Sequence, residues 1–310
     1  MDGALVTSML FATVVAGTPL ILVALGLLIN ERAGVLNLGA EGMMAIGAVA
    51  AFAVTHHSGS PWLGVAAGIT AGIAVSLIFA VLTLTLQANQ VASGLALAIF
   101  GVGLSAFIGK PYESIALQAV PPIRLPFIAD IPVIGEALYN QQVLVYVSWA
   151  LFWAVLWFLA KSRAGLVLRA VGESPASARA IGYPVVAIRY LAVLFGGAMA
   201  GLGGAFVAVF YTPMWVEGMI AGRGWIALAL VVFATWRPLR VMAGAYLFGG
   251  VMILQLFIQG SGLQLDLPSQ LLSALPYLAT IAVLVVISRD PNAIRLNSPM
   301  SLGKPFRPDA

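Results

Sequence analysis

Long apolar runs separated by short polar segments fill almost the whole sequence. Nine runs stand out, at residues 4–29, 43–54, 63–86, 91–108, 143–160, 185–211, 224–234, 241–258 and 271–287. Because about 20 apolar residues cross a bilayer as an α-helix, most of these runs are long enough to span one. The pattern predicts an all-α integral membrane protein with about nine (eight to ten) transmembrane helices, in a single polytopic domain over residues 1–288.

The second and seventh runs are too short for a simple crossing. Residues 33–42, AGVLNLGAEG, carry Asn37 and Glu41 where hydrocarbon is expected. Either this helix begins further back, near Gly34, or it is a broken helix of the kind that lines cavities in transporters. Residues 41–45, EGMMA, resemble residues 223–227, RGWIA, and an inverted repeat would bring two such broken helices together near the membrane midplane. Chance similarity between two glycine-rich helix starts is an equal alternative.

The composition excludes a water-soluble core, since 61% of the residues are hydrophobic and 8% are charged. Only Lys110, Arg124 and Arg223 fall outside the segments assigned to the cytoplasm. The other basic residues fall inside them: Arg32, Lys161, Arg163, Arg169, Arg179, Arg189, Arg237, Arg240, Arg289, Arg295, Lys304 and Arg307. This bias predicts an external N-terminus and a cytoplasmic C-terminus. It also accounts for the net charge of +4, which is therefore no sign of nucleic-acid binding.

One long polar stretch interrupts the apolar pattern, KSRAGLVLRAVGESPASARAIG at residues 161–182, within a predicted cytoplasmic loop over residues 161–184. The stretch contains four basic residues and a single acid, Glu173. Ser174 is a good N-cap residue, Pro175 suits the first helical position, and Gly182 suits the end of a helix. The stretch predicts a short helix just outside the membrane, where a cytoplasmic partner can bind it.

Glu41 and Arg223 are the charged residues predicted to lie nearest to hydrocarbon. A charge at a helix centre costs about 2.5 to 3.5 kcal/mol, so each must face a cavity, a partner or an interface. A carboxylate is favoured at a helix N-terminus, whereas a cation there needs a compensating acid or anionic ligand. Asn37, Asn89 and Ser93 offer neutral hydrogen bonds, either to a ligand or between helices.

No catalytic residue, metal site or cofactor is expected. The sequence has no cysteine and no glycine-rich phosphate loop ending in Gly-Lys-Ser/Thr, so nucleotide hydrolysis must come from another chain. No serine and histidine both lie at membrane depth, which argues against an intramembrane protease. His56 and His57 lack a nearby acid or third histidine, and a solvated turn explains them better than a metal site.

Three stretches together resemble one family. They are ERAGVLNLGAEGMMAIGA at 31–48, RAVGESPASARAIG at 169–182, and GRGWIALALVVFATWRPL at 222–239. They are similar to the permease subunits of bacterial ABC importers for simple sugars and branched-chain amino acids. The first and third look most like the subgroup that works with basic-membrane-protein-type lipoproteins and imports nucleosides. The resemblance covers roughly residues 19–289 and implies an inner-membrane location.

The resemblance also implies partners and roles. The working unit would contain two permeases, two cytoplasmic ATPases and an external binding lipoprotein or periplasmic protein. The loops at 110–142 and 212–222 would dock that external protein. The short helix would be a coupling helix that binds an ATPase, through Arg169, Glu173, Ser174, Pro175, Ala178, Arg179 and Gly182. The chain reads Glu-Ser-Pro where the family usually has Glu-Asn-Pro, and serine caps helices about as well as asparagine.

The expected function is therefore a transport subunit without catalysis of its own, most consistent with a nucleoside permease. Asn37, Glu41, Ser93 and Arg223 are the expected lining residues of the path, and the second permease is expected to be a different, related chain. A sugar or branched-chain amino acid permease is the alternative within the class. An ion-coupled secondary transporter, with Glu41 as its only candidate acid, is the alternative outside it. A plain membrane anchor fits broken helices poorly. The tail at 289–310 is expected to be cytoplasmic and poorly ordered.

Overall fold

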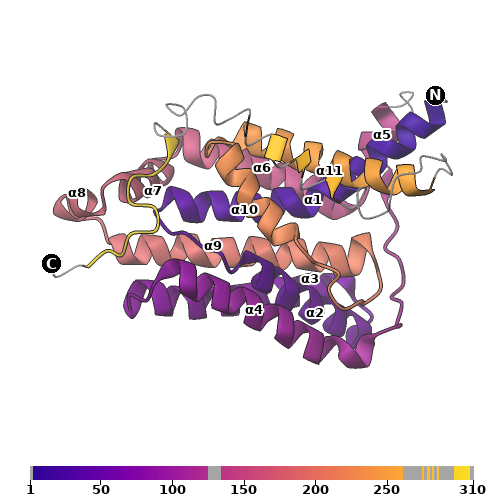
Figure 1. Cartoon of the computed structure of the whole chain (residues 1–310), viewed down its shortest axis with the longest axis horizontal. Coiled ribbons are helices and arrows are strands. Elements are labelled where there is room, and N and C mark those ends of the chain that lie inside the picture. Colours follow the sequence, from indigo (N-terminus) through magenta and orange to yellow (C-terminus); the bar gives the residue numbers. More distant parts are fainter. Residues whose placement is uncertain are drawn as a thin grey trace.

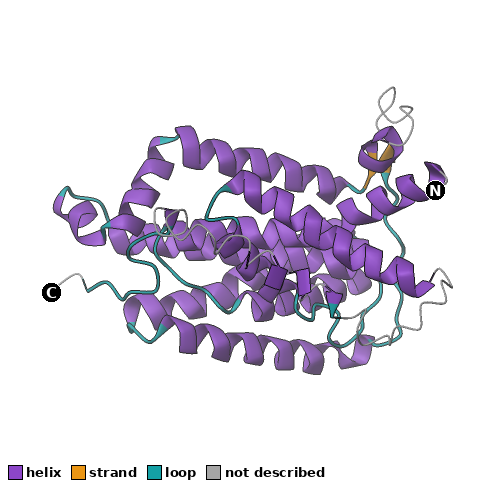
Figure 2. Ribbon diagram, turned by 45° about the horizontal axis from the view of Figure 1, so that its top comes forward, coloured by secondary structure: helices purple, strands orange, loops and turns teal. Residues whose placement is uncertain are grey.

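The computed structural model describes residues 3–124, 134–260 and 297–307, together with 274–275, 278–279, 281–282 and 285. Its longer helices run side by side along one axis, and the start of α1 lies at the opposite end from α8 (Figures 1 and 2). The helices are α1 Gly3–Arg32, α2 Ala40–Ser58, α3 Pro61–Ala80, α4 Gln90–Gly109, α5 Ile134–Tyr139, α6 Val143–Lys161, α7 Arg163–Glu173, α8 Pro175–Ala180, α9 Val185–Ala205, α10 Arg223–Phe233 and α11 Pro238–Gly260.

Short elements complete these helices. A π-helical turn extends α3 over Val81–Thr85 and another extends α9 over Phe206–Tyr211, and a 3-10 turn follows α4 at Lys110–Tyr112. Two strands of two residues each, β1 Ile123–Arg124 and β2 Asn140–Gln141, pair antiparallel in the loop before α6. The fold of the described residues is therefore all-α apart from this small pairing, as predicted.

Six helices of the described residues are long and apolar enough to cross a membrane: Leu5–Arg32, Pro61–Thr85, Gln90–Tyr112, Val143–Lys161, Val185–Tyr211 and Pro238–Gln259. Helix α2 is not among them, and α10 is a shorter apolar helix. The predicted run at 271–287 lies largely outside the described residues. The chain is thus a multi-pass membrane protein, and the predicted count of nine spans is not confirmed.

Helix α9 lies at the centre of the bundle, packed on α1, α2 and α3. Its glycines allow this contact: a Cβ added at Gly201 would lie 2.9 Å from the carbonyl carbon of Gly68 and 3.2 Å from the Cα of Gly72, both on α3. A Cβ at Gly196 would lie 2.7 Å from the Cγ of Asn30 on α1. Gly68 and Gly72 of α3 and the glycines of α9 therefore allow the close packing of these helices.

We expect Gly201→Val to prevent normal assembly of the bundle, because its side chain would have to displace α3 backbone rather than a flexible side chain. Overpacking of this kind costs about 1 to 3 kcal/mol or more. Gly103→Val on α4 is the matched control, because a Cβ there meets nothing within 4 Å. Thermal melting in mild detergent measures both variants, and equal melting temperatures would contradict the packing argument.

Three local predictions were wrong. Residues 163–173 were assigned to a loop but form α7, an amphipathic helix that buries Leu168 and Val171 one turn apart. His56 and His57 were assigned to a turn but belong to the last turn of α2, which ends at Gly59 with φ 68°. The third concerns the tail: residues 297–307 were expected to be poorly ordered but pack against the bundle, as described below.

Candidate functional site: the junction of the two broken helices

Helices α2 and α10 both begin inside the bundle. Helix α2 starts after the non-helical residues 35–37 and the turn at 38–39, beside the middle of α4, where a Cβ at Gly42 would lie 2.9 Å from the Cα of Ala98. Helix α10 starts after the loop at 212–222, and a Cβ at Gly224 would lie 2.6 Å from the Cα of Glu41. The sequence left an inverted repeat and chance similarity as equal alternatives for these two helix starts, and the structure shows that the two starts are in contact.

The Glu41 carboxylate holds the junction together. Its Oε1 accepts a hydrogen bond from the backbone N–H of Gly222 at 2.6 Å, and its Oε2 accepts from those of Gly224 at 2.7 Å and Trp225 at 3.3 Å. These groups are among the N–H groups that a helix N-terminus leaves without a partner, and a carboxylate satisfies them with charge-assisted bonds. Glu41 is only 5% exposed. It caps the partner helix α10 rather than serving only its own helix.

Arg223 lies at the same junction, and its hydrogen bond and its ring contact are with groups other than the Glu41 carboxylate. Its guanidinium donates to the carbonyl of Met219 and lies 5.7 Å from the centroid of the Tyr211 ring. Among the described residues it forms no ion pair with Glu41. The cation at the start of α10 is therefore stabilised by a carbonyl and an aromatic face. The Glu41 carboxylate forms its hydrogen bonds with the backbone.

Asn37 and Ser93 complete the set of predicted path residues. Asn37 is buried, and its Oδ1 accepts from the N–H of Gly39 at 2.9 Å, which shapes the turn before α2. Ser93 is half-buried on α4, next to Gly94, where an added Cβ would lie 2.8 Å from the backbone nitrogen of Leu38. The structure thus places Asn37, Glu41 and Arg223 around the junction, with Ser93 on the neighbouring helix. Asn89 instead caps α4 by accepting from the N–H of Ala92 at 3.0 Å.

A second polar cluster, which the residue-by-residue prediction missed, joins α1 to the turn before α11. Glu31 is fully buried, and its Oε2 accepts from the indole N–H of Trp236 at 2.6 Å. Arg32 donates to the carbonyl of Trp236 at 2.8 Å. The signal was present in the sequence, because Glu31 and Trp236 lie within two of the three stretches that carry the family resemblance.

The C-terminal segment 297–307 joins three distant parts of the chain through Ser301. Its Oγ donates to the carbonyl of Gly172 at 2.5 Å and accepts from the Nη2 of Arg189 at 3.0 Å. Arg189 is 1% exposed, and its Nε donates to the carbonyl of Ala33 at 3.1 Å. The N–H of Gly303 donates to the carbonyl of Gly34 at 3.3 Å. The segment therefore links the end of α7 and the start of α9 to the loop that leads into α2.

The predicted short helix is present as α8, at the end of the molecule in Figure 1. The Oγ of Ser174 accepts from the N–H of Ser177 at 3.3 Å, Pro175 occupies the first helical position, and Gly182 has φ 93°. Ala178 is buried, whereas Glu173 and Arg179 are exposed. Arg169 is half-buried on α7. The capping signals were therefore interpreted correctly, and α8 follows the short helix α7 at the end of the molecule.

The two loops expected to dock an external protein lie together. The N–H of Leu117 donates to the carbonyl of Pro213 at 2.8 Å, and isolated bridges pair Glu113 with Trp215 and Ala116 with Met214. These described parts of the loops at 110–142 and 212–222 form one surface at the end of α4. Residues 125–133, in the middle of the first loop, lie outside the described residues.

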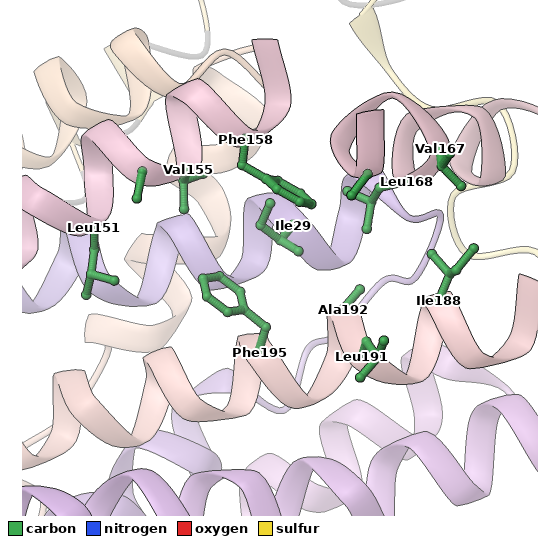
Figure 3. A pocket seen from close by; sticks show the side chains of 12 residues that line it. Ile29, Leu151, Val155, Phe158, Val167, Leu168, Ile188, Leu191, Ala192 and Phe195 are labelled. Carbon is green, nitrogen blue, oxygen red and sulfur yellow. The ribbon is translucent and has the colours of Figure 1, made fainter. Parts of the chain in front are cut away.

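A pocket of about 620 Å³ lies between α6, α7 and α9 and is lined entirely by aliphatic and aromatic residues (Figure 3). None of its lining residues has a hydrogen-bonding side chain to offer a polar solute. It is therefore a poor candidate for a solute path, in contrast to the α2–α10 junction.

Comparison with known proteins identifies the class. Residues 9–284 match the model of the family described as branched-chain amino acid transport system / permease component. The chain belongs to this family and is the permease subunit of an ABC importer, a transport component rather than an enzyme. The family implies an ATPase and a substrate-binding protein as partners, together with a lipid bilayer.

Three relatives are similar over most of their length. A putative glucose ABC transporter permease protein of Haloferax volcanii, TsgC13, is 42% identical over 95% of this chain and 95% of the relative. The guanosine ABC transporter permease protein NupQ of Bacillus subtilis is 34% identical over 88% of this chain and 89% of the relative. The nucleoside ABC transporter permease protein NupC of Lactococcus lactis is 35% identical over 87% of this chain and 88% of the relative.

Proposed function

We propose that this chain forms one half of the path for an uncharged, hydroxyl-bearing solute, a nucleoside, across the cell membrane. The observation that carries the proposal is the α2–α10 junction, where two helices begin inside the bundle and the chain itself supplies the partners of Glu41 and Arg223. Broken helices at such a position provide irregular backbone for a solute path. A path without free charges suits a neutral solute.

Two features favour a nucleoside. Two of the relatives are named for guanosine and nucleoside transport. In addition, Trp225, whose backbone N–H donates to Glu41, is 38% exposed. An exposed indole beside the junction offers an aromatic face on which a purine or pyrimidine base can lie.

A sugar is the second candidate, because the relative at 42% identity is named for glucose. Ribose and hexoses present similar hydroxyl groups, so the same donors and acceptors serve either. An uptake assay distinguishes the two candidates. The complete transporter is placed in proteoliposomes with internal ATP, and uptake of labelled guanosine is compared with uptake of labelled glucose. Uptake of guanosine alone supports the nucleoside proposal. Uptake of glucose alone contradicts it and shows that the solute is a sugar.

The coupling to ATP hydrolysis runs, in this proposal, through α8 on the cytoplasmic side. The ATPase binds α8 and moves it. This movement is transmitted directly to α9, and it is transmitted to the loop before α2 through the hydrogen bonds that join Gly172, Ser301 and Arg189. This arrangement supports an external N-terminus and a cytoplasmic C-terminus. The second permease is proposed to be a different, related chain, and the external binding protein is proposed to dock on the surface formed by residues 113–117 and 213–215.

Reversing both exposed charges of the coupling segment, Glu173→Arg with Arg179→Glu, is expected to release the ATPase. The bonds across a docking surface of this kind depend on complementary charge, and a like charge at the same place repels. Co-purification of the ATPase with tagged permease measures the effect, and we expect at least a tenfold loss. Lys110→Glu, an exposed charge reversal at the end of α4, is the control. Undiminished co-purification of the double variant would remove α8 from the interface.

A further inference from the structure

The apolar pocket between α6, α7 and α9 has features of a lipid site. On α6 it is lined by residues from Leu151 to Phe158 and on α9 by residues from Ile188 to Phe195. These are the halves of the two helices nearest to α7 and α8. Helix α7 closes this end with Ala164, Val167 and Leu168 (Figure 3).

The pocket reaches the outside of the bundle. Leu191, which lines it from α9, is 68% exposed, and Ala154, which lines it from α6, is also exposed. Both helices are candidate membrane spans, so the medium outside the rim is the hydrocarbon of the bilayer. The molecules that reach this rim in a membrane are lipids, whose acyl chains match the apolar lining.

Two basic residues lie at the α7 end of the pocket. Lys161 follows the lining residue Phe158 by one helical turn, and Arg163 directly precedes the lining residue Ala164. Both are exposed, and among the described residues neither forms an ion pair. The first turn of α7 contains no acid. Positive charge is thus placed where the head group of a lipid in the pocket would lie.

We propose that this pocket binds one acyl chain of an anionic phospholipid, whose phosphate lies between Lys161 and Arg163. Acyl chains in the bilayer are already in an apolar medium, so an acyl chain gains little free energy when it enters the pocket. Selectivity must therefore come from the head group. Basic residues between transmembrane helices near the cytoplasmic surface attract anionic head groups. Each lysine or arginine raises the affinity for such a head group about fivefold.

The test is a lipid titration of the full-length chain, purified with the subunits that accompany it and followed by native mass spectrometry. The probes are phosphatidylglycerol and phosphatidylcholine with identical acyl chains. We expect the wild-type chain to bind phosphatidylglycerol at least tenfold more tightly. The double variant Lys161→Ser with Arg163→Ser is expected to bring this preference below threefold. Ala154→Phe, which fills the pocket from an exposed position, is expected to weaken both lipids about tenfold.

A matched control removes two exposed basic residues elsewhere, Arg237→Ser with Lys304→Ser, and is expected to keep the full preference. The proposal is overturned if the Lys161 and Arg163 variant keeps its preference, or if Ala154→Phe binds both lipids as the wild-type chain does. It is also overturned if the wild-type chain in the assembled transporter binds neither lipid, because the pocket is then closed to lipid. None of these outcomes depends on the solute that is transported.

Discussion

Glu41→Ala is expected to abolish ATP-driven uptake and to lower the free energy of unfolding by about 3 kcal/mol or more. The substitution leaves three backbone N–H groups at the start of α10, those of Gly222, Gly224 and Trp225, without their acceptor. A buried donor left unpaired costs about 1 to 3 kcal/mol. The junction would lose the carboxylate that accepts these three hydrogen bonds, so both solute uptake and stability should be lost.

Thermal melting of the purified complex and solute uptake in proteoliposomes measure this prediction. Glu217→Ala is the control, because Glu217 is exposed in the loop before α10 and surface substitutions change stability by about 0.5 kcal/mol or less. If Glu41→Ala melted like the control and kept its uptake, the carboxylate would not hold the junction.

Glu41→Gln separates ATP-driven transport from transport coupled to a proton gradient. Glutamine keeps one side-chain oxygen as an acceptor but cannot exchange a proton at neutral pH. We expect slower uptake that still requires ATP, with a melting temperature between those of the wild-type chain and Glu41→Ala. Uptake that follows a proton gradient without ATP in the wild-type chain, and is lost in Glu41→Gln, would contradict the ABC mechanism.

Local signals in the sequence were sufficient for most helices of the described residues. The run predicted at 185–211 is the candidate span Val185–Tyr211, and α8 begins and ends where Ser174, Pro175 and Gly182 indicated. Apolar length and capping chemistry act over a few residues, so one sequence reveals them. Helix α7 was missed because it lies in a polar stretch of the chain and is recognisable by its apolar spacing alone.

The contacts of the site depend on residues far apart in the chain, and the sequence predicted them less well. The pairing of a charge with a glycine at both helix starts was compatible with a contact between α2 and α10 and equally with chance similarity. It did not indicate that Glu41 would cap α10, because the dipole of its own helix already explained a carboxylate there. The docking of the tail gave no local signal, since Ser301 is 112 residues from Arg189 and 129 from Gly172.

Arg189→Ala is the second large effect that we expect, and it should detach the segment 297–307 from the bundle. The guanidinium is 1% exposed and donates to the carbonyl of Ala33 and to the Oγ of Ser301, and it lies 5.9 Å from the centroid of the Phe306 ring. Hydrogen bonds from a charged donor contribute about 1.5 to 3 kcal/mol each. The loss should therefore be about 3 kcal/mol.

Hydrogen exchange measures this detachment directly, and we expect faster exchange at the N–H groups of Ser301 and Gly303, which donate to Gly172 and Gly34. Arg307→Ala is the matched control, because Arg307 is exposed and its Nε donates to the side chain of Gln87 rather than to the groups that hold Ser301. If the proposed coupling path is correct, Arg189→Ala also leaves the ATPase bound while ATP hydrolysis no longer responds to solute. Retained protection at Ser301 would show that the tail is held without Arg189, and a normal response to solute would show that coupling bypasses the tail.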